Sequence, residues 1–71
     1  MTAIEKVSRA ELAYQQILNN IREGIYKPGF RITEADVAES LKMSRTPVRE
    51  ALRRLESAGL ITIASHGMQI S

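Results

Sequence analysis

Three arginines recur at a spacing that would place them in one row on a helix. Arg45, Arg49 and Arg53 stand four residues apart within the segment SRTPVREALRRLE, residues 44–56. Residues four apart lie on the same face of an α-helix, so the three guanidinium groups would line one edge. A guanidinium group matches guanine O6 and N7 with two hydrogen bonds, the commonest specific contact between a side chain and a base. The spacing therefore indicates base recognition in the major groove of DNA.

The start of this expected helix sets which side chains would lead into the groove. Ser44 is predicted to cap it, and Pro47 is tolerated in the first turn because the N–H that it lacks would have no helical partner. If the helix enters the groove by this end, Arg45, Thr46 and Arg49 point at base edges. Ser44 and the helix N-terminus can bind a phosphate. Arg53 and Arg54 lie further along and are expected to face the DNA backbone or to pair with Glu50 and Glu56.

The other side of the helix is apolar and should face a core. Its inward stripe consists of Val48, Ala51, Leu52, Leu55 and Ala58, and Gly59 ends the helix. A second helix begins at the predicted cap Thr33 and breaks at Lys42-Met43. Two helices joined by a tight break, the second with a basic N-terminus, form a helix-turn-helix pattern.

The rest of the chain supplies support for these two helices. Ser8 and Glu11 have the spacing of a capping box before a first helix of about residues 9–23, which Gly24 ends. One apolar stripe follows this helix, formed by Tyr14, Ile17, Leu18, Ile21 and Ile25. Residues 30–32 could pair with a later strand, and residues 60–63 and 68–70 alternate as a hairpin. The predicted fold is mainly α with a small β-hairpin.

Composition restricts the classes of function. The chain has 71 residues, enough for one small domain, and it contains no cysteine for disulfides or thiolate chemistry. Residues 1–41 hold five basic and six acidic side chains, whereas residues 42–71 hold five basic and two acidic ones. A local basic cluster of this kind is typical of a nucleic-acid-binding surface. No catalytic constellation is evident, and a single histidine cannot build a metal site, so neither an enzyme nor a cofactor is expected.

Two other interpretations of the basic row remain open. The arginines could lie on a solvated face as ion-pair partners, with Glu56 near both Arg53 and Arg49, although an exposed pair is worth only about 0–1 kcal/mol. Alternatively, the third helix could dock on a partner protein. Arg31, which begins the short strand, could contact a phosphate or simply face solvent.

The run SRTPVREALRRLESAGLI, preceded by GIYKPGFRITEADVAESL, resembles the DNA-binding domain of the GntR family of bacterial transcription regulators, most closely its FadR-like branch. The resemblance covers residues 12–70. It implies a winged helix-turn-helix, three helices plus a wing, in which each arm of a homodimer binds half of a palindromic double-stranded operator, usually to repress. The base-contacting positions of the family match Arg45 and Arg49, Thr46 matches a further DNA-contacting position, and Gly67 matches the glycine of the wing.

Three positions depart from the family pattern. Some relatives carry an arginine on the second helix where this chain has Ala35, so any DNA contact from that site is absent here. Many relatives have glycine in the turn where this chain has Lys42, which implies some strain if the backbone needs a positive φ but also a possible phosphate contact. The wing often has arginine or lysine before its glycine, where this chain has His66. A histidine is mostly neutral at pH 7, so its minor-groove contact should be weaker or pH-dependent.

The resemblance also bears on domain organisation. Residues 1–7 are expected to form a flexible arm, and residues 8–71 the DNA-binding domain. Members of the family continue into a larger domain that dimerises and binds a small-molecule effector, so this chain is expected to be a fragment or an isolated N-terminal domain. Residues 1–7 lack the apolar core of a signal peptide, and no apolar run approaches the ~20 residues of a membrane span. We therefore expect a cytoplasmic location and no membrane contact.

Overall fold

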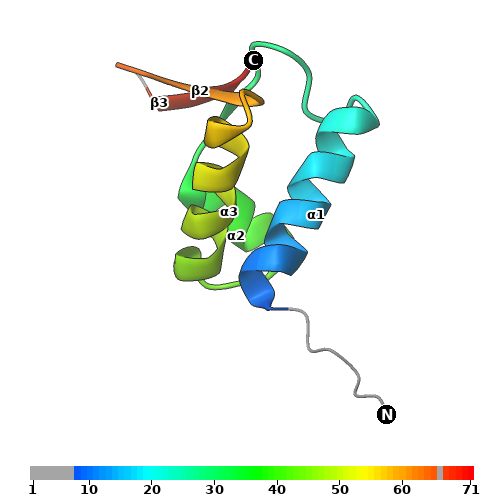
Figure 1. Cartoon of the computed structure of the whole chain (residues 1–71). Helices are drawn as coiled ribbons and strands as arrows, with labels where there is room; N and C mark the ends of the chain where they lie inside the picture. The colour runs from blue at the N-terminus through cyan, green and yellow to red at the C-terminus, as the bar shows by residue number, and fades with distance from the viewer. Residues whose placement is uncertain (1–7, 66) are drawn as a thin grey trace.

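The computed structural model describes residues 8–65 and 67–71, which form three helices and three short strands. The elements are α1 (Arg9–Arg22), β1 (Arg31–Ile32), α2 (Glu34–Leu41), α3 (Arg45–Ser57), β2 (Ile61–Ala64) and β3 (Gly67–Ile70) (Figure 1). The predicted arm, residues 1–7, and His66 lie outside the described residues.

Two of the three predicted helix caps are confirmed. The Ser8 hydroxyl accepts a hydrogen bond from the backbone N–H of Glu11, and the Thr33 hydroxyl accepts one from that of Asp36, both at 3.0 Å. Each bond satisfies a donor at the third helical position, which would otherwise have no partner within the helix. Local side-chain chemistry therefore sets where α1 and α2 begin.

The predicted side-chain cap of α3 is wrong. Ser44 does occupy the N-cap position, with extended backbone, but its side chain makes no capping hydrogen bond. The physical reason is Pro47, which stands at the third helical position and has no backbone N–H to offer. The Ser44 hydroxyl therefore lies exposed at the start of α3 without a capping role.

The three strands form one antiparallel sheet in the order β1-β3-β2. The predicted hairpin is confirmed, with Ile61 opposite Ile70 and Ala64 opposite Gly67. The short strand at residues 31–32 pairs with β3 on its other side, as expected, and the N–H of Ile70 donates to the carbonyl of Phe30 at 2.9 Å. This third strand ties the hairpin to the segment that leads into α2.

The core lies where α3 meets the other elements. It consists of Ala13, Ile17, Ile32, Val37, Ala38, Val48, Ala51, Leu52, Leu55, Ile61 and Ile70. Two residues of the predicted stripes are instead exposed: Ile25, at 60%, lies beyond Gly24 and so off the helix, and Ala58 is the C-cap of α3. Ala13, absent from the predicted stripe, is fully buried and belongs to the core.

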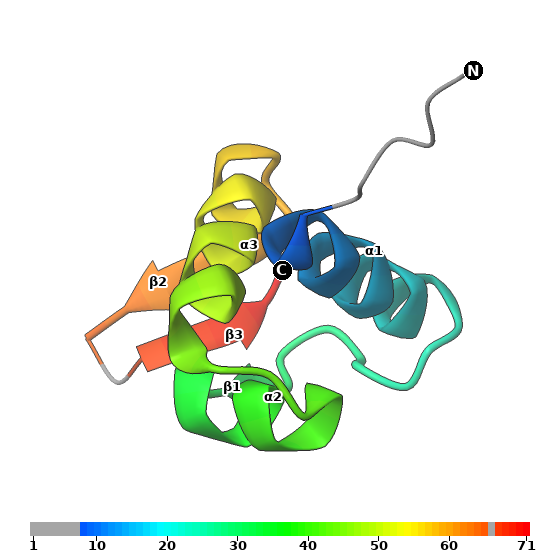
Figure 2. The ribbon, with the colours of Figure 1, turned by 90° about the horizontal axis from the view of Figure 1, so that it is seen from below.

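The sheet and α1 lie on different sides of α3. Both views show β2 and β3 extending outward from α3 on the side away from α1 (Figures 1 and 2). The exposed part of α3 and the hairpin therefore share one side of the molecule. Within the described ranges, no helix has the length and apolar character needed to span a membrane.

Candidate nucleic-acid interface

The connection between α2 and α3 is short and turns sharply at Lys42. Its φ of 57° and ψ of 46° are left-handed, a conformation that glycine adopts more readily than lysine. The N–H groups of Lys42 and Met43 donate to the carbonyls of Glu39 and Ala38, at 3.2 and 3.0 Å, and close the end of α2. The backbone at Lys42 thus has the positive φ on which the expected strain depends, and the two helices form a helix-turn-helix.

The predicted row of arginines lies on the surface of α3. Arg45, Arg49 and Arg53 are all exposed, as is Thr46. The opposite side of the helix is buried at Val48, Ala51, Leu52 and Leu55. Burial of this apolar stripe fixes the rotation of α3 and turns the basic row outward.

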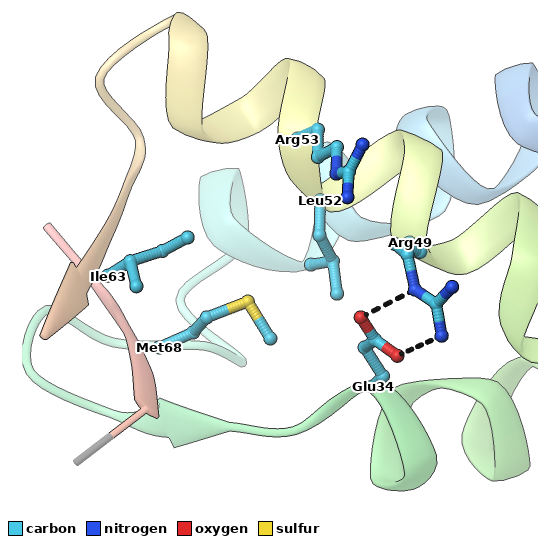
Figure 3. A pocket seen from close by; sticks show the side chains of 6 residues that line it. All are labelled: Glu34, Arg49, Leu52, Arg53, Ile63 and Met68. Atoms are coloured by element: carbon cyan, nitrogen blue, oxygen red, sulfur yellow. Dashed lines mark hydrogen bonds and ion pairs between the residues drawn. The ribbon is translucent and has the colours of Figure 1, made fainter. Parts of the chain in front are cut away.

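Arg49 is held by a carboxylate on the neighbouring helix. Its Nε donates to Glu34 Oε2 at 3.0 Å and its Nη2 donates to Glu34 Oε1 at 3.1 Å, so that both carboxylate oxygens are engaged (Figure 3). The hydrogen bonds from Arg49 lower the pKa of Glu34 below its ordinary value, and the same pair raises the pKa of Arg49. The sequence did not predict this partner, which lies fifteen residues away along the chain; the acidic side chain expected near Arg49 was Glu56.

A pocket between α3 and the sheet adjoins this ion pair. It is lined by Glu34, Arg49, Leu52, Arg53, Ile63 and Met68. Figure 3 shows Ile63 and Met68 across the pocket from the Arg49–Glu34 pair. Ile63 is 55% exposed, and neither it nor Met68 was predicted as a site residue.

Arg54 belongs to a different cluster. Its Nη1 donates to Glu11 Oε1 at 2.6 Å, and its Cζ lies 3.8 Å from the centre of the Tyr14 ring. The expectation that Arg54 faces DNA backbone or pairs with Glu50 or Glu56 is therefore wrong, because it points toward α1. Hydrogen bonds from Gln15 and then from Arg54 lower the pKa of Glu11. The cluster joins α1 to α3 and leaves the basic row to the other three arginines.

The remaining predicted contacts are all on the surface. Arg31 is exposed on β1, and Lys42 and Ser44 are exposed at the turn before α3. Gly67 begins β3 with a φ of 116°, a backbone conformation that favours glycine. The structure thus leaves each of these groups accessible, while the expectation for His66 lies outside the described part of the chain. Within that part, no cluster of three potential ligands could hold a metal ion.

Solved structures identify the class of this fold. The chain superposes with a TM-score of 0.81 and 30% identity on a GntR-family transcriptional regulator from Pseudomonas syringae, over 89% of this chain and 27% of that one. It superposes with a TM-score of 0.84 on the DNA-binding domain of AraR in complex with operator ORR3, at 22% identity over 100% of this chain and 88% of that one. The fold is therefore that of a winged helix-turn-helix DNA-binding domain.

Sequence comparisons identify the family. The family model for bacterial regulatory proteins of the gntR family matches residues 9–67, and the chain belongs to this family. A helix-turn-helix-type transcriptional regulator of Agrobacterium vitis is 41% identical over 61 residues, which are 86% of this chain and 36% of that protein. The regulator YdhC of Bacillus subtilis is 48% identical over 48 residues, 68% of this chain and 21% of its own length. The chain thus spans about a third or less of the length of these relatives, and it is a DNA-binding domain of the type found in transcription regulators.

Proposed function

We propose that this domain binds a half-site of a palindromic operator by inserting α3, N-terminus first, into the major groove. The observation that carries the proposal is the outward row of Arg45, Arg49 and Arg53 on a helix whose other face is anchored in the core. In this orientation Arg45, Thr46 and Arg49 contact base edges, and each bidentate arginine distinguishes guanine from the other bases.

The groups around α3 would hold the DNA backbone. Arg31, Lys42 and Arg53 are exposed cations that can each neutralise a phosphate, and Ser44 presents a hydroxyl with no capping role. Contacts of this kind fix orientation and register but carry no sequence information. The wing, with His66 and Gly67, would reach the adjacent minor groove.

The whole regulator is proposed to act as a homodimer in the cytoplasm, commonly as a repressor. Two domains held by a dimer bind two half-sites with an effective-concentration advantage that a single domain lacks. A second domain would provide the dimer contacts and bind the small-molecule effector. Support for these statements comes from the family membership and from the much greater length of the relatives.

The test is fluorescence anisotropy of this chain with a pool of labelled duplexes at two salt concentrations. Binding through phosphates should weaken with salt, with a slope of about −0.9 per neutralised phosphate in a plot of log K against log salt. The Arg45→Ala/Arg49→Ala double variant should lose sequence preference while retaining part of its affinity for random DNA, because its phosphate contacts remain.

The alternative, a winged helix that docks on a protein through α3, makes a different prediction. No DNA binding by a chain fused to a dimerising module, at low salt, would favour that alternative. Fusion is needed because a single half-site is bound more weakly than a pair.

A further inference from the structure

The Arg49–Glu34 pair leaves one edge of the guanidinium group available. Glu34 occupies the edge formed by Nε and Nη2, at 3.0 and 3.1 Å. A guanidinium group carries five N–H donors, so three remain: both on Nη1 and one on Nη2. The Nη1–Nη2 edge can still donate two parallel hydrogen bonds to guanine. In Figure 3 the free terminal nitrogen of Arg49 points away from Glu34.

Glu34 is itself firmly placed. It is the first residue of α2, directly after the cap Thr33, whose side chain accepts a hydrogen bond within that first turn. The positive end of the helix favours a carboxylate at this position. The Glu34 side chain is 26% exposed, whereas that of Arg49 is 50% exposed. The more buried and better anchored partner therefore fixes the more exposed one.

We propose that Glu34 is a positioning residue that sets base preference through Arg49. This inference rests on the proposed function, because it assigns a role to Arg49 at a base edge. A long side chain loses rotamer freedom when it binds, and holding it in place beforehand reduces that loss for the one base it matches. An unsupported arginine would instead adapt to several bases or turn to a phosphate.

Glu34 also carries a charge that disfavours DNA. A carboxylate beside the groove repels phosphates, and this repulsion acts on every sequence alike. Removal of the Glu34 carboxylate should therefore leave the affinity for random DNA unchanged or raise it. It should also lower the preference for the best half-site over random DNA. A purely electrostatic role predicts only the first effect.

The experiment is selection from a pool of random-sequence duplexes by the 71-residue chain, followed by anisotropy with the enriched duplex and with a scrambled one. Three variants are compared with the wild type. Glu34→Gln removes the charge, Glu34→Asp keeps the charge but shortens the side chain, and Glu39→Gln removes a charge from another exposed position of α2. The melting temperature of each variant shows that it is folded.

If Glu34 positions Arg49, both Glu34 variants lower the ratio of enriched to scrambled affinity by about 3- to 10-fold, a part of what a complete bidentate contact provides. The loss should be confined to one or two base pairs, and Glu39→Gln should leave the ratio unchanged. In an Arg49→Ala background, Glu34→Gln should cause no further loss of preference.

Three results would overturn the inference alone, and a fourth would overturn the proposed function with it. An unchanged ratio in Glu34→Gln, or an equal loss with and without Arg49, would show that Glu34 does not act through Arg49. Wild-type preference in Glu34→Asp would show that only its charge matters. If neither the wild type nor its fusion to a dimerising module enriches a motif, the proposed function fails together with the inference.

Discussion

Pro47 occupies the position of α3 whose backbone N–H the side chain of Ser44 would otherwise cap. In α1 and α2 the equivalent positions are Glu11 and Asp36, and both donate to the hydroxyl of the cap residue at 3.0 Å. In α3 this donor is missing, and Ser44 makes no capping hydrogen bond. The helix that carries the basic row thus begins with a hydroxyl that can turn to a phosphate.

Removal of the two hydroxyls should therefore have unequal effects on folding. Thr33→Ala should lower the free energy of unfolding by about 1 kcal/mol, as expected for loss of a capping bond. Ser44→Ala should lower it by less than about 0.5 kcal/mol. Thermal unfolding followed by circular dichroism separates these values, since 1 kcal/mol shifts the melting temperature of a domain of this size by roughly 4–8 °C.

The role of Pro47 can be tested by the same measurement. In a Pro47→Ala background, a backbone N–H returns at the third helical position, and Ser44→Ala should then become about as destabilising as Thr33→Ala. Equal losses from Ser44→Ala with and without the proline would contradict this explanation.

Lys42→Gly should stabilise the fold and weaken DNA binding at the same time. Lys42 has a φ of 57°, and glycine adopts this conformation without strain, so we expect a gain of about 0.5–1 kcal/mol. Loss of the ammonium group should reduce the salt slope of DNA binding by about one phosphate contact. Lys42→Arg is the control, because it keeps the charge and the strain. A slope that is the same in Lys42→Gly and wild type would exclude the phosphate contact.

Gly59→Val should be clearly destabilising. Gly59 follows α3 with a φ of 82°, where a β-branched side chain is strained, and we expect a loss of about 1–3 kcal/mol. Ala58→Val places the same side chain one residue earlier, where φ is −83° and the position is exposed, and should change stability by less than about 0.5 kcal/mol. Similar melting temperatures of the two variants would show that α3 does not end as described.

The helices and the hairpin could be predicted because their signals are local. Ser8 and Thr33 lie three residues before the N–H groups that they accept from, and Gly24 lies just past the end of α1, so each element carries its own boundary. The wrong prediction for Ile25 also comes from a local signal. Its spacing continues the apolar stripe of α1, but Gly24, directly before it, ends the helix, and Ile25 is exposed.

The site could be predicted only in part. The row of Arg45, Arg49 and Arg53 follows from helical spacing, which the sequence displays directly. The ion pair of Arg49 with Glu34 does not follow from spacing, because the position of Glu34 depends on how α2 packs against α3. The same holds for Arg54, whose contacts with Tyr14 and Glu11 depend on the packing of α1. The place of the chain in the FadR-like branch stays a prediction.

Stability should fall in acid because of two carboxylates. Hydrogen bonds lower the pKa of Glu34, chiefly from Arg49, and that of Glu11, chiefly from Gln15, below the ordinary value of 4.5. A group whose pKa is lowered by folding stabilises the fold above its unfolded pKa and loses this effect as pH falls through its folded pKa. The melting temperature of Glu11→Gln/Glu34→Gln should therefore depend less on pH below about 4.5 than that of the wild type. Glu39→Gln, which removes an exposed carboxylate outside both ion pairs, serves as the control; a wild-type slope in the double variant would contradict the assignment.

Arg45 and Arg53 should respond differently to truncation, although they lie in one row. Arg45 is at the leading end of α3, where base edges are closest, so Arg45→Ala should weaken binding to the enriched duplex by roughly 5- to 150-fold and relax preference at one base pair. Arg53 is two turns further along and should face the backbone. Arg53→Ala should therefore weaken binding to enriched and scrambled duplexes by the same factor and reduce the salt slope by about 0.9.

Both variants are measured by anisotropy at two salt concentrations, with their melting temperatures as a check of folding. If Arg53→Ala changed base preference and Arg45→Ala did not, α3 would have to enter the groove by its opposite end.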